Sequence, residues 1–255
     1  MKKVITFVSE SEYASNKKVF DSAKKLNDHL YKVKKQKKWN YLDGQGNLLG
    51  ETWFDWCDNF DEGFARVELN KKWNLIDEQG NFISETWFND CWHSHEGFAT
   101  VKLNDRWNFI DNQGNLLSDQ WFDACCSFSE GFAAVKLNGR WNLINKQGNF
   151  IGEQWFDDCY NFYEGFGRVK LNKKWNFINK QGNIISDQWF DACDCFHEGF
   201  AAIILNDRCN YVNQQGNLLS EEWFYTCWRF NEGVATVVIN GDYKLINKEG
   251  KIINN

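Results

Sequence analysis

Thiol and imidazole side chains gather at Cys91, His93 and His95, and Cys125 and Cys126 follow them in the chain. Thiolates and imidazoles are ligands that zinc prefers in proteins. In an extended segment His93 and His95 would lie on the same face, because they are two residues apart. No Cys-x-x-Cys pair of the kind found in structural zinc sites accompanies them. We therefore expect no bound metal and no cofactor, and these five residues remain the one alternative.

Carboxylates that could act as acid and base recur at one equivalent position, as in Asp55, Asp123, Asp157 and Asp191. Acid–base catalysis needs one particular pocket in which two groups have different pKa values, and repetition argues against this. The sequence also lacks a nucleophile elbow, a phosphate-binding loop and a Ser-His-Asp order. We predict that the protein is not an enzyme.

These residues all belong to a pattern that begins again every 34 residues without insertion or deletion. Its starting residues are Trp39, Trp73, Trp107, Trp141, Trp175, Cys209 and Tyr243. A fixed period of this length is typical of repeat architectures, in which each repeat is one supersecondary unit. The predicted organisation is a divergent capping unit (1–38), six repeats (39–72, 73–106, 107–140, 141–174, 175–208 and 209–242) and a C-terminal half-repeat hairpin (243–255).

Each repeat is predicted to hold three short antiparallel strands. In one repeat, Phe132–Leu137 shows the alternation of a strand. Asn138-Gly139 then predicts a two-residue hairpin turn, because both residues accept positive φ. The second strand should cover about 140–144, and the third should cover roughly 149–156.

The connection to the next repeat is predicted to contain a helical turn, because Phe156, Cys159 and Phe162 are three residues apart. Each connection ends in a Glu-Gly pair whose Gly should take positive φ. The recurring Glu needs a partner, which is either a turn N–H group or a basic residue at the end of the repeat. Those basic residues are Lys72, Arg106, Arg140, Lys174 and Arg208. In the first unit, Lys17–His29 has the spacing of a short helix as an alternative to a strand.

The predicted fold is all-β, an open β-solenoid or superhelix of three-stranded 34-residue repeats. A β-propeller-like ring is the alternative. The half repeat at 243–255 favours the open form, since a ring should contain a whole number of repeats.

The composition limits the classes of molecule that the protein can be expected to bind. A net charge of −6 and a pI near 5.3 argue against nucleic acid and anionic membranes, which attract basic surfaces. No apolar run approaches the length of a membrane span, and Val4–Val8 is too short for a secretion signal. Six of the nine cysteines share one repeat position, which suits buried thiols rather than a disulfide framework. A reducing, cytoplasmic location is expected.

The two parts of each repeat match a known pattern. The first reads KKWNLIDEQG, DRWNFIDNQG and GRWNLINKQG, and the second reads FSEGFAAV and FYEGFGRV. Together they resemble the bacterial WG repeat over residues 39–253. Asn follows Trp here, where the family name has Gly, as in Asn74, Asn108 and Asn142. The resemblance implies a β-rich repeat fold with a binding function, and it implies no catalytic residues.

Residues that recur are expected to be framework, and residues that differ between repeats are free to form a recognition surface. The framework includes the Trp-Phe pairs, for example Trp121-Phe122, which we expect to stack between repeats. The candidate binding residues are Trp56, Trp92, Tyr160, Tyr163, His197, Trp228 and Arg229. Aromatic and Arg side chains are typical of interface hot spots, so a protein partner is expected. Binding of a carbohydrate or small ligand in exposed Trp and Tyr pockets is the first alternative, and a purely structural spacer is the second.

Overall fold

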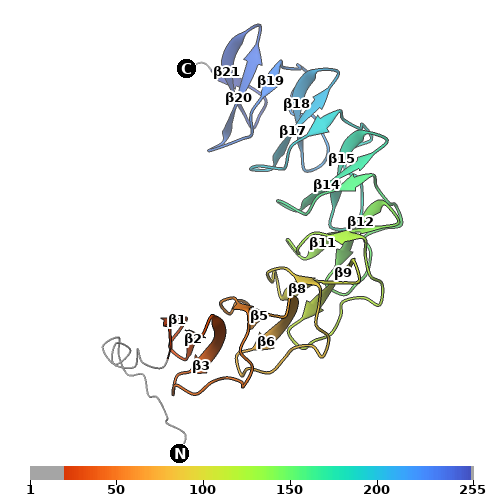
Figure 1. The fold of residues 1–255 in the computed structure, drawn as a ribbon. Coiled ribbons are helices and arrows are strands. Elements are labelled where there is room, and N and C mark those ends of the chain that lie inside the picture. Colours follow the sequence, from red (N-terminus) through yellow and green to blue (C-terminus); the bar gives the residue numbers. More distant parts are fainter. Residues whose placement is uncertain (1–19, 254–255) are drawn as a thin grey trace, which may run out of the picture. The chain divides into compact units, whose positions relative to one another are not determined.

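A computed structural model describes residues 20–253 of the 255-residue chain, and the regular elements of this part are all strands (Figure 1). No segment of the described residues forms a helix that could cross a membrane. The strands are β1 (Ser22–Lys25), β2 (Leu30–Lys35), β3 (Lys38–Asp43), β4 (Trp56–Cys57), β5 (Phe64–Leu69), β6 (Lys72–Asp77), β7 (Asp90–Cys91), β8 (Phe98–Leu103), β9 (Arg106–Asp111), β10 (Ala124–Cys125), β11 (Phe132–Leu137), β12 (Arg140–Asn145), β13 (Asp158–Cys159), β14 (Phe166–Leu171), β15 (Lys174–Asn179), β16 (Ala192–Cys193), β17 (Phe200–Leu205), β18 (Arg208–Asn213), β19 (Thr226–Cys227), β20 (Val234–Ile239), β21 (Asp242–Asn247) and β22 (Ile252–Ile253).

The strands form separate antiparallel sheets in two compact units, which divide after Trp121. The first unit holds the sheets β1–β3, β4–β6 and β7–β9. The second unit holds the sheets β10–β12, β13–β15, β16–β18 and the four-stranded β19–β22. No strand hydrogen bonds join one sheet to another, so the described residues form no closed barrel. The predicted all-β fold of three-stranded repeats, with the separate sheets of an open solenoid, is confirmed.

The predicted hairpin at Asn138-Gly139 is confirmed, but the predicted third strand is in the wrong place. Strand β11 pairs with β12, and both turn residues have positive φ, 50° and 80°. The third strand is the two-residue β10, which precedes the hairpin and pairs Cys125 with Val135. The only β-bridges between residues 149–156 and β12 are the isolated ones at Phe150 and Phe156. Between these bridges the Gly152 carbonyl group accepts a hydrogen bond from the Asn142 side chain in place of a strand N–H group.

The predicted helical turn between repeats is also wrong. Phe156, Cys159 and Phe162 are all buried, as their spacing suggested. However, Cys159 lies on strand β13, and the segment after it continues along β14 through backbone hydrogen bonds from Tyr160 to Arg168 and from Tyr163 to Phe166. The residues point inward from an extended chain that changes direction, so a spacing of three did not require a helix.

The first described sheet has the same construction as the others. Strand β1 lies within the stretch where a helix was the alternative, and it pairs with β2 from Ser22↔Lys34 to Lys25↔Tyr31. The helix is therefore excluded for the described part of Lys17–His29. The preceding residues 1–19, where the rest of the divergent unit was predicted, lie outside the described residues.

The core lies between consecutive sheets within each unit. Tyr41 on β3 packs with Val67 and Ile76, which belong to the β4–β6 sheet. Each sheet thus buries its apolar face against the next sheet, as repeat proteins do. The backbones also approach closely: a Cβ built on Gly216 would lie 1.8 Å from the carbonyl oxygen of Ile185 in the preceding repeat. Only glycine fits there, because the obstacle is backbone and its φ is +80°.

Candidate functional site

The recurring aspartates hold the hairpin turns. The carboxylate of Asp191 accepts a hydrogen bond from the Asn206 backbone N–H at 2.8 Å and pairs with the Lys174 ammonium group. These two contacts hold the pKa of Asp191 below its ordinary value. Asp157 does the same with Asn172 and Arg140. Arg140 and Lys174, two of the basic residues at the ends of repeats, therefore pair with these aspartates and not with the Glu-Gly glutamates.

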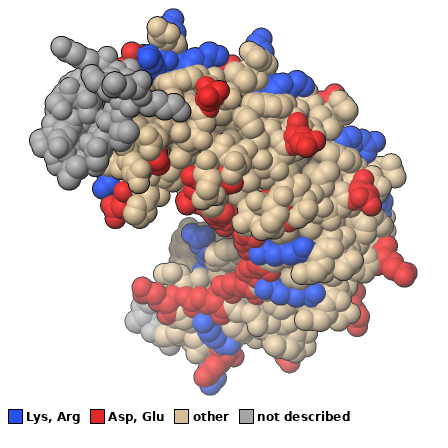
Figure 2. Space-filling model, turned by 90° about the horizontal axis from the view of Figure 1, so that it is seen from below, with Lys and Arg blue, Asp and Glu red and all other residues tan. Residues whose placement is uncertain are grey.

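The glutamates of the Glu-Gly pairs bind the backbone of the next repeat instead. Glu62 accepts hydrogen bonds from the N–H groups of Glu96 and Gly97, at 3.0 and 2.8 Å. Glu198 accepts hydrogen bonds from the N–H groups of Glu232 and Gly233 in the same way. It also pairs with Lys248 at 2.9 Å. The Lys248 ammonium group and the turn N–H groups hold the pKa of Glu198 below its ordinary value. Acidic and basic side chains accordingly lie next to one another on the face shown in Figure 2.

Both residues of these turns have positive φ, for example 52° at Glu130 and 90° at Gly131. Positive φ was predicted for the glycine only. A non-glycine residue in this conformation is strained by about 1 kcal/mol, so the surrounding contacts must hold it. The hydrogen bonds that the turn N–H groups donate to the preceding glutamate, as Glu198 and Gly199 do to Glu164, supply such contacts.

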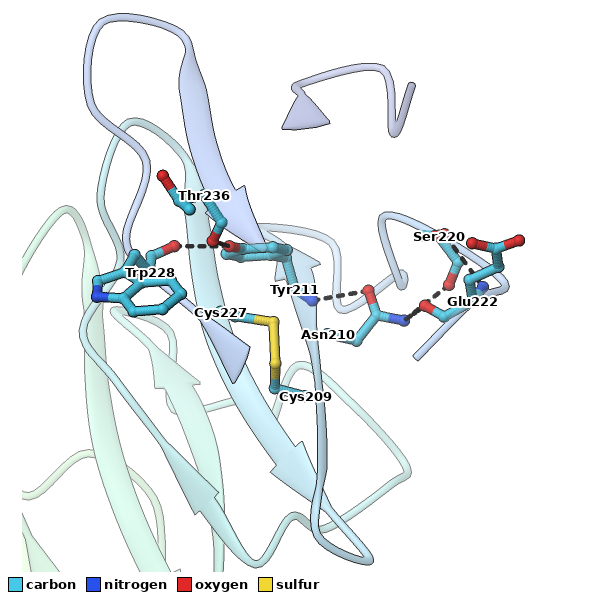
Figure 3. The surroundings of a disulfide bond; sticks show 8 residues. All are labelled: Cys209, Asn210, Tyr211, Ser220, Glu222, Cys227, Trp228 and Thr236. Carbon is cyan, nitrogen blue, oxygen red and sulfur yellow. Dashed lines mark hydrogen bonds between the residues drawn. A yellow bond between two sulfur atoms is a disulfide. The ribbon is translucent and has the colours of Figure 1, made fainter. Parts of the chain in front are cut away.

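The cysteines at the shared repeat position are mostly buried thiols. Burial raises the pKa of Cys57 to about 11 and that of Cys91 to about 12, so both are neutral near pH 7. Cys227 is different: it forms a disulfide with Cys209, which stands where the other repeats have Trp (Figure 3). The expectation that the shared position avoids disulfides is wrong for this residue. It fails because the buried Cys209 lies on the preceding sheet and faces the half-buried Cys227 of the next one.

The candidate metal ligands belong to different environments. Cys91 is buried in a hydrophobic cluster, whereas the His93 ring lies 2.9 Å from the Arg66 guanidinium group. His95 closes a turn through its backbone, which bonds to Phe98. Cys125 and Cys126 belong to the second compact unit. Within residues 20–253, no three or more His, Cys, Asp or Glu side chains are grouped as ligands of one ion.

Three of the candidate binding residues occupy the same position in alternate repeats. Trp92, Tyr160 and Trp228 are each 68 residues apart, and their exposed fractions are 40%, 45% and 45%. The residues at the equivalent position of the other repeats are Asp58, Cys126 and Asp194. The sequence interpretation treated these positions as unrelated, although the numbering alone shows the regularity.

Each of these three rings rests on an aromatic residue of the column that starts the repeats. The centroid distances are 4.4 Å for Trp92–Trp107, 5.7 Å for Tyr160–Trp175 and 5.9 Å for Trp228–Tyr243. Arg168 adds a cation over Tyr160 at 4.6 Å and donates a hydrogen bond to the Cys193 carbonyl group. The exposed rings are therefore held in place by neighbouring rings rather than free in solvent.

The remaining candidates lie close by in the chain. Trp56 is exposed on strand β4, and its ring contacts Trp39 at 6.4 Å. Tyr163 and His197 occupy one position in consecutive repeats, and their rings are 5.3 Å apart. Arg229 is exposed directly after Trp228. The structure thus joins the candidates into ring pairs beside the edge strands of separate sheets, and not into one pocket.

A family model of the WG containing repeat matches the chain five times, at residues 41–73, 75–107, 109–141, 143–175 and 177–209. These matches cover more than half of the chain. The chain belongs to the WG containing repeat family.

Solved structures resemble this WG-repeat chain only distantly. Hsv2 of Kluyveromyces lactis is 12% identical, with a TM-score of 0.39 and coverage of 74% of this chain and 72% of the other. AztD of Citrobacter koseri, in its apo form, is 10% identical, with a TM-score of 0.36 and coverage of 89% and 82%. A protein of unknown function from Bacteroides caccae is 13% identical, with a TM-score of 0.29 and coverage of 72% and 88%. No curated protein matched the sequence.

The structure explains why these WG repeats carry Asn in place of the Gly of the family name. Asn176 is fully buried, and its side-chain N–H groups donate to the carbonyls of Ser186 and Gln188, at 2.7 and 3.2 Å. Its side-chain oxygen accepts the Phe177 N–H. The equivalent residues Asn40, Asn74, Asn108, Asn142 and Asn210 are also buried and make the same type of bond. This amide replaces the strand hydrogen bonds that residues 149–156 and their counterparts lack.

Two further surfaces were missed in the sequence. Exposed apolar side chains recur two residues after the loop glycine of each repeat, and they include Leu48, Phe82, Leu116, Phe150, Leu218 and Ile252. They were passed over because they repeat, and repetition was taken to indicate framework. A cavity beside Cys209 was also missed. Its signal was present, because Cys209 interrupts a column of tryptophans.

Proposed function

We propose that this WG-repeat chain is a non-catalytic scaffold that binds a protein partner through exposed aromatic side chains beside its edge strands. The observation that supports the proposal is the packing of Trp92, Tyr160 and Trp228 against other aromatic rings. Each ring exposes close to half of its surface, yet each is supported by another ring. Trp and Tyr are enriched among hot-spot residues. A ring that is already held loses less conformational freedom when it binds, so more of its contact energy becomes affinity.

The charges next to the rings fit the same proposal. Arg168 stacks on Tyr160 and lies 6.0 Å from the Trp175 ring centroid. Arginine, like Trp and Tyr, is frequent in hot spots because it combines a flat apolar surface with directed donors. The net charge of −6 supports a partner other than nucleic acid.

The test uses the full-length chain as bait in an extract of its own cells, followed by titration calorimetry with the captured protein. The double variant Tyr160→Ala, Trp228→Ala should weaken binding at least tenfold, because it removes two anchors. Leu218→Ala is the matched comparison, since Leu218 is 46% exposed and belongs to the recurring apolar row. Thermal unfolding should show that both variants remain folded. Loss of binding in Leu218→Ala, with full binding in the double variant, would move the interface to the apolar row.

A second candidate function is carbohydrate binding, and the equivalence of Trp92, Tyr160 and Trp228 favours it. Three similar aromatic platforms at one repeat position predict several similar, weak sites. In a glycan titration followed by NMR, each single Ala variant should remove one site and leave the others. An absence of any saturable glycan shift would reject this function.

A further inference from the structure

The repeat that starts at Cys209 contains a cavity of about 470 Å³ within the second compact unit. This volume lies within the range of small-molecule sites in proteins. Its wall comes from all three strands of the β16–β18 sheet and from β19 of the next sheet. The lining residues include Cys209, Ala202, Ile204, Asp194, Arg208 and Tyr225.

The preceding β13–β15 sheet shows what normally occupies this place. There the Trp175 indole lies against the Tyr160 ring, with the Lys170 ammonium group 5.0 Å and the Arg168 guanidinium group 6.0 Å from its centroid. One repeat later, these large side chains are replaced by shorter ones. Cys209 replaces Trp175, Asp194 replaces Tyr160, Ala202 replaces Arg168 and Ile204 replaces Lys170.

The cavity is therefore the space that an indole fills elsewhere in the array. The backbone around it follows the same register in both sheets. Ile204 is paired with Cys209, as Lys170 is paired with Trp175. Cys209 and Cys227 both line the cavity. Their disulfide joins its sheet to the next one (Figure 3). The backbone around the cavity is thus the same as in the preceding repeat. The cavity exists because four side chains that face it are shorter than their counterparts there.

The rim of the cavity has charges that suit an aromatic occupant. At the equivalent positions of three other sheets, Lys38, Arg140 and Lys174 pair with Asp55, Asp157 and Asp191. Here Tyr225 stands at the aspartate's position. The Arg208 guanidinium group lies 3.7 Å from the centre of the Tyr225 ring. A second flat ring beside Arg208 would present its negative face to the cation. Asp194 supplies a carboxylate that can accept a hydrogen bond from a ring N–H group.

We propose that this cavity binds one flat aromatic group of indole size that carries an N–H donor. The group takes the place of the missing tryptophan, with its face beside Arg208 and its N–H directed to Asp194. It comes either from a free indole-type compound or from a tryptophan side chain of a peptide. This site is independent of the exposed ring pairs, so its test does not depend on the protein-binding proposal.

The test is a ¹⁹F NMR titration of the full chain with two probes, 5-fluoroindole and a blocked pentapeptide with a central 5-fluorotryptophan. Wild-type protein should give a saturable shift with at least one probe. A shift with 5-fluoroindole alone assigns the site to a free compound, and tighter binding of the peptide assigns it to a side chain. An absence of a saturable shift with both probes would overturn the proposal.

Two variants fill the cavity in different ways. Cys209→Trp restores the tryptophan of the column, and Ala202→Arg restores the arginine found at position 168. Each should weaken probe binding at least tenfold. Thr236→Arg is the matched control, because it places the same side chain at the same repeat position one sheet later, outside the cavity. It should leave binding unchanged.

Wild-type protein treated with a reductant controls for loss of the disulfide in Cys209→Trp, and it should still bind. If Cys209→Trp does not fold, as judged by thermal unfolding, Ala202→Arg decides, since it keeps both cysteines. Undiminished binding in a folded Ala202→Arg protein would overturn the proposal. Equal loss in Thr236→Arg would also overturn it.

Discussion

The side chain of Glu164 binds the backbone of Glu198, its own counterpart one repeat later, with a carboxylate–N–H distance of 2.9 Å. A second hydrogen bond of 2.9 Å reaches the N–H of Gly199. Each glutamate of this kind is therefore both a donor to the repeat before it and an acceptor for the repeat after it. The glutamates of the Glu-Gly pairs repeat at one position, where like charges would repel one another. Their hydrogen bonds instead link consecutive repeats within each compact unit.

Removal of this link should destabilise the second compact unit. We expect Glu164→Ala to lower the free energy of unfolding by about 1–2 kcal/mol, because a charged acceptor of two turn N–H groups is lost. The midpoint of urea unfolding measures the change. Glu232→Ala is the control, since residues 20–253 contain no counterpart of the Glu232-Gly233 turn one repeat later. An equal loss in both variants would contradict the role of the link.

Stability should fall in acid because of carboxylates whose pKa is lowered by folding. For Asp191 the ordinary value is 3.8 and for Glu198 it is 4.5, and both are lower in the folded chain. Their contribution is therefore complete above these ordinary values and is lost as the pH falls through the lowered folded values. The urea midpoint should be nearly constant from about pH 7 to 5 and should decrease below about pH 4.5. Asp191→Asn should reduce the midpoint at neutral pH and make its decrease in acid shallower, whereas an unchanged profile would contradict the assignment.

The buried amide that replaces the family's glycine should be essential to the repeat. In Asn176→Ala, the carbonyls of Ser186 and Gln188 lose their donor. The expected cost is about 1–3 kcal/mol, which corresponds to a decrease in Tm of roughly 2–4 °C per kcal/mol for a protein of this size. Asn183→Ala, at an exposed position of the same repeat, should change Tm very little. Scanning calorimetry distinguishes the two, and similar Tm values would show that the amide is dispensable.

The disulfide should be detectable by thiol counting. Unfolded, unreduced protein should show seven free thiols, and reduced protein should show all nine. Reduction should destabilise the second unit by about 2–4 kcal/mol, the usual effect of a disulfide that closes a short loop. Cytosolic thiols are normally kept reduced. Counting thiols in protein taken directly from its own cells therefore also tests the expected cytoplasmic location, and nine thiols there would support it.

Much of the local structure could be predicted from residue types alone. The hairpin turns followed from Asn138-Gly139 and its equivalents, because few residues accept positive φ at two consecutive positions. The burial of Phe156, Cys159 and Phe162 followed from their spacing of three residues. The helical turn assigned to them was wrong, since a bent extended chain can bury residues three apart as well as a helix can.

The 34-residue period determined by itself that the chain is an all-β array of equivalent repeats. It did so because each repeat can bury its apolar face only against another copy. Only the tertiary structure decided how consecutive copies are joined: Glu164 to the Glu198 turn, and Cys209 to Cys227. These partners are supplied by a neighbouring sheet, and their distances depend on how two sheets stack. The cavity beside Cys209 has the same origin. The sequence contained the change from Trp to Cys, but whether neighbours would close the gap was decided by packing.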